Sequence, residues 1–166
     1  GYLCCVEIHP SGRYAVVLAD VRVDRYLQGQ VRVLELESAT EAWRGAANHV
    51  GFGRALKLSK CGNAVFSAAR ERVRNLLVHD FYTGELLFNL DGHRRDVNQL
   101  QEASHDLLLS ASDDCTIRIW NWRRGTCVRI LGRPLKGPDA HLSATVFYST
   151  SDAIVRGGAQ AFSAVL

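Results

Sequence analysis

The sequence predicts an all-β protein built from repeats of four short strands. Apolar runs of strand length recur along the chain, and several alternate apolar with polar residues at the strand period of two. Segments rich in Gly, Pro, Ser, Asn and Asp separate these runs and favour turns. Similar segments return at offsets of roughly 40 to 50 residues, a period typical of repeat proteins.

The clearest repeat unit is Gly92–Trp120, which contains a Gly-His pair, two alternating strands and a tight turn. Residues 97–101 and 116–120 alternate at strand period. The segment 110–116 between them supplies short side chains and Asp residues that tolerate a left-handed backbone, which favours a hairpin turn. A polar break is expected at 102–106.

The remaining strands are expected in the same order within each unit. The predicted strands are 2–8, 13–19, 30–37 and 40–44 in the first unit, and 52–58, 64–69, 76–81 and 85–90 in the second. The segment Asp20–Gly29 is longer than a tight turn and predicts an enlarged loop. The predicted units are 1–50, 51–91, 92–136 and a truncated 137–166.

The Gly-His opening and the Trp ending of the clearest unit resemble the WD40 repeat. The resemblance implies an all-β WD40 β-propeller segment of about three to four blades, which is an incomplete ring. It also implies a hydrogen-bonded tetrad of His93, Ser110, Asp114 and Trp120, with Ser112 as the second-choice hydroxyl. That tetrad has a structural role, because it locks the loop before the blade onto its third strand.

The other units depart from this pattern. His79 stands where Trp would be in the second unit, and Asn121 rather than Asp follows Trp120 in the third. In the fourth unit 159–166 replaces the Asp turn. Tetrads are therefore expected to be absent from three of the four units, while the fold prediction stands.

From Gly92 onward, the motifs GHRRDVNQLQ, LLLSASDDCTIRIWNW, RRGTCVRILGRPLKG and HLSA resemble the Polycomb WD40 subunit of the extra sex combs and embryonic ectoderm development type. The resemblance implies a nuclear, chromatin-regulating scaffold for a histone H3 lysine methyltransferase complex, with a histone as partner. Pro138 stands where this family has the His of its next Gly-His pair, and no aromatic set matches the family's methyl-lysine cage. Recognition of methyl-lysine is therefore not carried over.

A second resemblance leaves an alternative open. Trp120-Asn121-Trp122-Arg123 is similar to the Trp-Asp-x-Arg box by which some WD40 proteins dock onto a cullin–ring ubiquitin ligase adaptor, although Asn121 replaces the Asp. The alternative function is therefore a substrate receptor of such a ligase. Trp122 is either exposed as an interface anchor or packed under the neighbouring blade.

Catalytic chemistry finds little support in the sequence. The adjacent pairs His79-Asp80 and His105-Asp106 face opposite sides of a strand, and no third ligand stands at a metal-like spacing. The glycines of 51–53 and 157–158 are not followed by a helix start or a Lys-Ser/Thr pair, so they do not form phosphate loops. We expect a non-catalytic protein with no cofactor and no metal.

Composition agrees with an ordinary globular chain of 166 residues. Five cysteines in no metal-like spacing favour reduced thiols in the nucleus or, alternatively, the cytoplasm. We expect no membrane association, because neither a signal segment nor a long apolar run is present. The chain begins at Gly1 and has no Met, so we expect a piece of a longer protein.

The net charge is only +3, yet the expected loops separate the basic residues onto one rim of the propeller. The residues assigned to this rim are Arg22, Arg25, Arg70, Arg72, Arg74, Arg94, Arg95, Arg133 and Lys136. The opposite rim is expected to be mixed, with Glu37, Lys60, Asp106, Arg123, Arg124 and Asp152. We expect the basic rim to dock other protein subunits through an acidic segment, or the phosphate backbone of a nucleic acid.

Overall fold

The computed structural model describes residues 2–45, 49, 51–70, 76–104 and 106–132, together with two short strands near the C-terminus. The described residues form only strands, turns and loops, so the all-β prediction is confirmed. No helix that is long and apolar enough to span a membrane occurs in this part of the chain.

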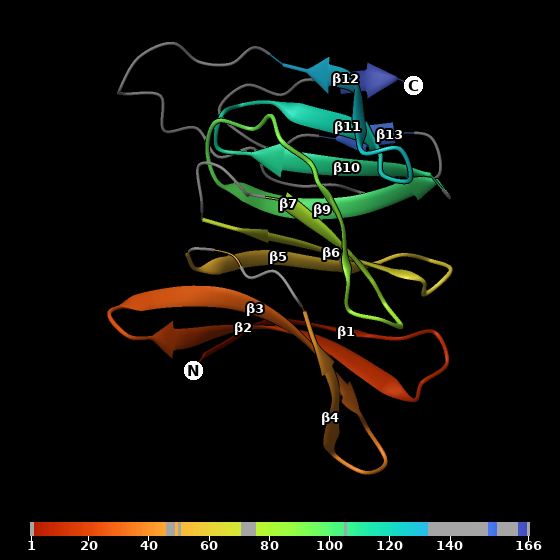
Figure 1. Ribbon diagram of the computed structural model, residues 1–166. Coiled ribbons are helices and arrows are strands. Elements are labelled where there is room, and N and C mark those ends of the chain that lie inside the picture. The colour runs from red at the N-terminus through yellow and green to blue at the C-terminus, as the bar shows by residue number, and fades with distance from the viewer. Residues whose placement is uncertain are drawn as a thin grey trace.

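Three four-stranded antiparallel sheets follow one another along the chain, and each is a meander of consecutive strands. The first contains β1 (Tyr2–Ile8), β2 (Tyr14–Val23), β3 (Tyr26–Glu35) and β4 (Thr40–Arg44); the second contains β5 (Gly53–Leu58), β6 (Ala64–Ala69), β7 (Leu76–Asp80) and β8 (Leu86–Asn89); the third contains β9 (Val97–Ser104), β10 (Leu107–Ser112), β11 (Ile117–Asn121) and β12 (Thr126–Leu131). The sheets lie face to face in chain order (Figure 1).

The predicted fourth unit, 137–166, lies largely outside the described residues. Its two described strands, β13 (Ala153–Val155) and β14 (Ser163–Val165), pair antiparallel with each other.

Two apolar layers hold the three sheets together. The layer between the first and second sheets contains Val16, Leu18, Val31, Val33, Leu56, Leu58, Val65 and Phe81. The layer between the second and third contains Ala55, Ala64, Phe66, Ala68, Leu76, Val78, Leu90, Val97, Leu100, Leu108, Trp120 and Trp122. Because neighbouring strand residues face opposite sides, β6 contributes to both layers and all six of its residues are buried.

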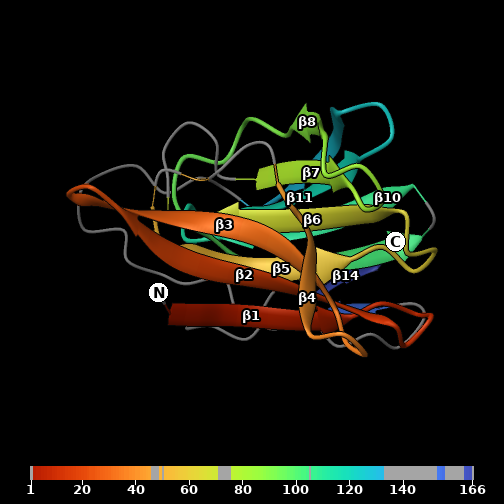
Figure 2. The same cartoon turned by 60° about the horizontal axis from the view of Figure 1, so that its bottom comes forward.

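The predicted loop Asp20–Gly29 is wrong, because the chain continues as two long strands. Ladder pairing extends through three pairs beyond Asp20 and Gly29, and ends at the turn residues Asp24 and Arg25. Asp24 adopts a φ of 54°, which Asp tolerates and which suits a two-residue hairpin turn. The resulting hairpin, residues 21–28, is called the arm below, and it reaches past the ends of the neighbouring strands (Figures 1 and 2).

The polar break predicted at 102–106 is shorter than expected, because β9 runs on to Ser104 and β10 begins at Leu107. Glu102 is buried within this strand, and its Oε2 accepts a hydrogen bond from the backbone N–H of Lys60 at 2.5 Å. This bond partners one oxygen of the buried carboxylate, while Oε1 is buried without a hydrogen-bond partner among the described residues. In the turn after β10, Cys115 rather than an Asp adopts the positive φ, at 64°.

Aromatic side chains of the outer strands pack on the glycine turns of the next sheet. A Cβ built on Gly84 would lie 2.8 Å from the Trp43 ring, and one built on Gly125 would lie 2.5 Å from the Phe88 ring. Both glycines also adopt a left-handed backbone, with φ of 73° and 66°. These positions therefore require glycine for two reasons, and the repeated contact fixes the spacing between sheets.

The buried layers predict that alanine substitution of Phe66, in β6, costs much more stability than that of Phe52, which directly precedes β5. Phe66→Ala removes a fully buried ring that packs edge-on against Trp122, and we expect it to lower the free energy of unfolding by about 3–5 kcal/mol. Phe52→Ala, at a half-exposed position, is the matched control and should cost less than about 1 kcal/mol. Urea denaturation of both variants measures the difference; similar losses would contradict this packing.

Candidate functional site

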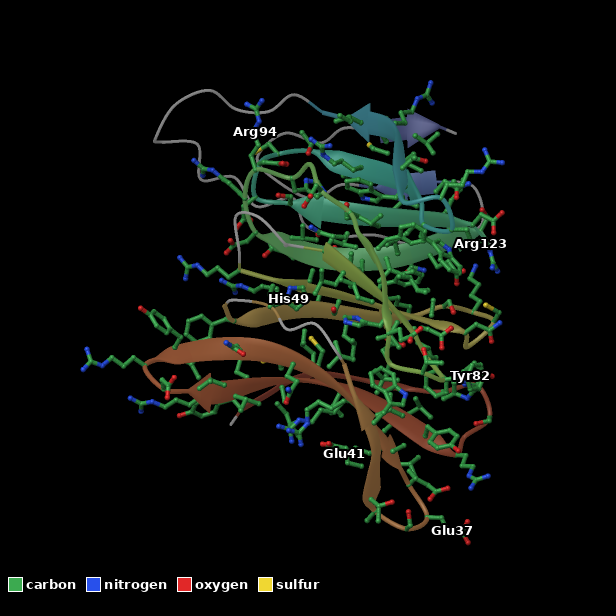
Figure 3. The ribbon with its side chains drawn as sticks, viewed as in Figure 1. Glu37, Glu41, His49, Tyr82, Arg94 and Arg123 are labelled. Atoms are coloured by element: carbon green, nitrogen blue, oxygen red, sulfur yellow. The ribbon has the colours of Figure 1, made fainter. Side chains whose placement is uncertain are left out.

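The loops and turns of the three sheets gather on two opposite rims. One rim, called the arm rim, carries the arm, the segments before β5 and β9, and the ends of β6 and β10. The other, called the turn rim, carries the β3–β4, β7–β8 and β11–β12 turns. Arg94 lies at the arm end of the stack, whereas Glu37, Tyr82 and Arg123 lie at the other end (Figure 3).

Hydrogen bonds and ion pairs connect the arm rim from one sheet to the next. The backbone N–H of Gly29 donates to the carbonyl of Gly51 at 2.8 Å, and the N–H of Gly53 donates to Asp20 Oδ1 at 2.8 Å. These bonds join the base of the arm to the entrance of β5. The arm rim is therefore one continuous surface rather than a set of separate loops.

Asp96 connects the second sheet to the third on this rim. Its Oδ2 lies 3.6 Å from Nη2 of Arg54 and 3.4 Å from Nε of Arg70. Burial raises the pKa of the Asp96 carboxyl, and the two guanidinium groups oppose that rise. The nearby Asp113 carboxylate raises the same pKa, so two positive and two negative charges meet at this point of the rim.

The predicted basic residues fall into two groups. Arg70, Arg94 and Arg95 flank the ends and entrances of strands at the arm rim, and Arg22 and Arg25 lie on the arm. The others lie outside the described residues: Arg72, Arg74, Arg133 and Lys136.

Sequence reasoning missed three residues of the arm rim. Arg54 shares Asp96 with Arg70, as described above. Tyr26 and Phe52 leave 71% and 46% of their surface exposed on the same rim. The alternation around the Asp24-Arg25 turn is the signal that would have placed Tyr26 on a strand.

A buried hydrogen-bonded network joins the entrance of the third sheet to its third strand. Trp120 Nε1–H donates to Ser110 Oγ at 2.8 Å, and Ser110 Oγ lies 2.6 Å from His93 Nε2. The Asp114 carboxylate accepts from Nδ1, so we assign Nε2 as the acceptor of the Ser110 hydroxyl proton, while the hydroxyl oxygen accepts from the indole. His93 Nδ1–H then donates to Asp114 Oδ2 at 3.0 Å. The four residues of the predicted tetrad therefore lie together.

The Asp114 carboxylate accepts further hydrogen bonds besides the one from the His93 imidazole. Its Oδ2 accepts the Arg94 N–H at 2.9 Å, and its Oδ1 accepts the N–H and the hydroxyl of Thr116 at 2.9 and 2.5 Å. Burial alone would raise the pKa of the Asp114 carboxyl, but the hydrogen bonds from His93, Thr116 and Arg94 hold it well below its ordinary value. Through the Arg94 contact, the network also positions a residue of the arm rim.

Ser112, the second-choice hydroxyl, is buried outside this chain of bonds. Its Oγ donates to the Arg95 carbonyl at 3.1 Å and accepts from the Asp114 N–H at 3.1 Å. It therefore supports the turn rather than replacing Ser110.

The second sheet retains part of the same arrangement, which sequence reasoning did not find. His49 Nε2 lies 2.9 Å from Ser67 Oγ, and both side chains are fully buried. His79 is paired with Val65 on β6, as Trp120 is paired with Leu108 on β10, so an imidazole occupies the position of the indole. The His49–Ser67 pair is part of a tetrad and not a complete one, so the expected absence of a full tetrad from this unit stays a prediction.

The structure shows whether Trp122 is exposed or packed between sheets. This side chain is 3% exposed and packs edge-on against Phe66 of the second sheet. The Arg123 guanidinium lies 4.6 Å from the Trp122 ring centroid, and its Nε donates to Asp106 Oδ1 at 2.6 Å. Trp122 is therefore part of the packing between sheets, and Arg123 is an exposed, ion-paired turn residue.

Within the described ranges, His, Cys, Asp and Glu side chains form no group of three or more that could hold a metal ion. Asp80 Oδ1, from one of the His-Asp pairs, accepts from the N–H groups of Tyr82 and Thr83 at 2.8 Å and so shapes a turn. His105 and residues 157–158 lie outside the described residues.

Residues 84–121 match the WD40 family, described as WD domain, G-beta repeat. This segment is similar to a WD40 repeat. The match contains most of the third sheet and all four residues of its buried network. Together with the stacked four-stranded meanders, it confirms the predicted fold class of an all-β WD40 propeller segment.

Curated relatives cover a larger part of the chain. Mouse (Mus musculus) pre-mRNA-processing factor 19 is 30% identical over 122 residues, which cover 66% of this chain and 24% of that protein. Human (Homo sapiens) striatin is 24% identical over 140 residues, which cover 84% of this chain and 17% of that protein. The chain thus spans about a quarter or less of these relatives. Neither is the Polycomb subunit that the C-terminal motifs resemble.

Solved structures support the fold alone. The computationally designed Ika8 protein aligns with a TM-score of 0.72 and 20% identity, over 94% of this chain and 42% of that chain. The computationally designed Ika4 protein aligns with a TM-score of 0.69 and 21% identity, over 100% of this chain and 92% of that chain.

Trp120 contributes both packing and a hydrogen bond, and two variants separate them. Trp120→Ala should lower the free energy of unfolding by about 3–5 kcal/mol, because it opens a cavity and leaves Ser110 without its donor. Trp120→Phe keeps an aromatic ring and should lose about 1–3 kcal/mol. Thermal and urea denaturation measure both. A shift of only a degree or so in the Trp120→Ala melting temperature would contradict the role assigned to this side chain.

The lowered pKa of the Asp114 carboxyl predicts how the stability of the protein depends on pH. Its pKa is lower in the folded than in the unfolded chain, so its stabilising contribution is complete above the ordinary Asp value of about 4 and is lost as the pH falls below it. Asp114→Asn should therefore melt below the wild type at neutral pH, with the difference narrowing toward about pH 2. Melting curves across this range measure it, and a constant difference would show that ionised Asp114 does not stabilise the fold.

Proposed function

We propose that this protein is a non-catalytic scaffold that holds other protein subunits together in a multi-subunit complex. The observation that supports the proposal is a rigid framework with exposed loops. Buried apolar layers and the His93–Trp120 network hold the sheets together, and loops from three successive sheets are exposed on two rims. Surfaces of this kind suit binding, because a rigid framework positions loops that need no movement of their own.

A Polycomb-type histone methyltransferase complex is the narrower assignment that we propose for this scaffold. The C-terminal motifs beginning at Gly92 support it through their resemblance to the Polycomb WD40 subunit. The resemblance favours a nuclear location and a histone as partner. The relative named pre-mRNA-processing factor 19 points to a different process. The motif resemblance is therefore the sole support for the Polycomb assignment.

The alternative is a substrate receptor of a cullin–ring ubiquitin ligase, favoured by the Trp120-Asn121-Trp122-Arg123 segment. Arg123 is exposed on the turn rim, where an adaptor could reach it. Its side chain already contacts Asp106 and the Trp122 ring, however, and docking through it would have to replace or share those contacts. This geometry favours the scaffold proposal over the ligase alternative.

Purification of the tagged protein under mild lysis tests the proposal. We expect at least one protein partner at a stoichiometric ratio, identified by mass spectrometry, and chromatin-modifying subunits among the partners if the Polycomb assignment is right. Elution of the protein alone would contradict the scaffold function.

The same purification with Arg123→Ala discriminates the ligase alternative. We expect the set of partners to remain unchanged, because Arg123 makes only local contacts on the turn rim. Selective loss of a cullin-adaptor partner from this variant would favour the ligase instead. Arg124→Ala, its exposed neighbour, is the matched control.

A further inference from the structure

Exposed arginines and exposed aromatic rings occur together on the arm rim. Arg22 and Arg25 lie on the arm beside Tyr26, and Arg70 follows β6 with 62% of its side chain exposed. Phe52 lies at the entrance of β5, where its carbonyl accepts the Arg70 N–H at 2.7 Å. A surface that only needed to be solvated would not require exposed rings beside its cations.

The backbone places these groups along one path. Gly29 is bonded to Gly51, the residue before Phe52, and Tyr26 lies three residues from Gly29 along β3, which is about 10 Å of strand. From Phe52 the path continues through Arg70 and its partner Asp96 to the segment that carries Arg94. It therefore crosses all three sheets.

We propose that the arm rim binds single-stranded nucleic acid, with the arginines along the phosphates and with Tyr26 and Phe52 stacked on bases. Proteins that bind single strands combine a positive track for the backbone with aromatic faces for successive bases, and this combination tolerates many sequences. Guanidinium groups suit phosphate because they donate two hydrogen bonds in a fixed geometry.

The exposed rings distinguish this ligand from the other anions that the rim could attract. A duplex keeps its bases stacked inside the helix, so it would contact the arginines and leave the rings without a partner. A polyglutamate segment would likewise satisfy the cations alone, because it has no flat apolar group to stack on the rings. Tyr26 is thus the residue whose contribution separates a single strand from both, and the inference does not depend on the scaffold proposal.

Fluorescence anisotropy of a labelled oligouridylate with the purified protein tests the inference. Tyr26→Ala should weaken binding about tenfold, because the variant no longer stacks on one of the bases. Tyr82→Ala is the matched control, because Tyr82 is 66% exposed on the turn rim, and it should leave the affinity unchanged.

The contribution of the arginines to the affinity is measured from its dependence on salt concentration. Arg22→Gln combined with Arg25→Gln should reduce the slope of log affinity against log salt by about 0.7 for each phosphate that no longer pairs with an arginine. Arg123→Gln with Arg124→Gln removes the same charge from the turn rim and should leave the slope unchanged. Melting curves of every variant verify that the fold is retained.

Three outcomes would overturn the inference. The first is absence of oligouridylate binding at low salt. The second is equal binding of a duplex and the single strand, with no effect of Tyr26→Ala, which would show a contact to phosphates alone. The third is competition by poly-glutamate at equal affinity, again with no effect of Tyr26→Ala, which would assign the rim to acidic protein segments. None of these outcomes is affected by whether protein partners co-purify.

Discussion

The rest of the structure depends on burial of the central strands between neighbouring sheets. All six residues of β6 are buried, because the first sheet covers one face of this strand and the third covers the other. Near-continuous apolar strands of this kind occur only where both faces are covered. The second sheet alone would expose both of its apolar faces to water, so stability belongs to the stack rather than to any repeat.

Polar groups inside such a stack are costly unless each finds a partner, and the His93–Trp120 network meets this condition in one connected chain. The second sheet shows a variation on the same solution, in which His49 and Ser67 remain paired and an imidazole replaces the indole. The repeats therefore preserve a buried polar position more faithfully than they preserve the residue types that mark it in the sequence.

Some strands could be predicted from the sequence with their observed bounds, among them the fully buried β6 and the mostly exposed β4. The arm was missed because most of its residues are exposed, so no buried apolar face marks this part of the β2–β3 hairpin. Glu102 was missed for a different reason: a buried carboxylate is recognisable only when its partner, the Lys60 N–H, is known. Long-range pairs such as Asp96 with Arg54 and Arg70 likewise leave no local pattern.

The fold and the proposed binding surface depend on different atoms of Arg94. Asp114 buries its carboxylate in the network, yet one of its oxygens holds the backbone of Arg94, whose side chain is exposed on the arm rim. A change in the exposed side chain leaves that backbone contact in place, because the hydrogen bond is made by the main chain. The arm rim can therefore vary in charge and shape at little cost to the fold, whereas loss of the buried carboxylate would affect the fold and the position of Arg94 together.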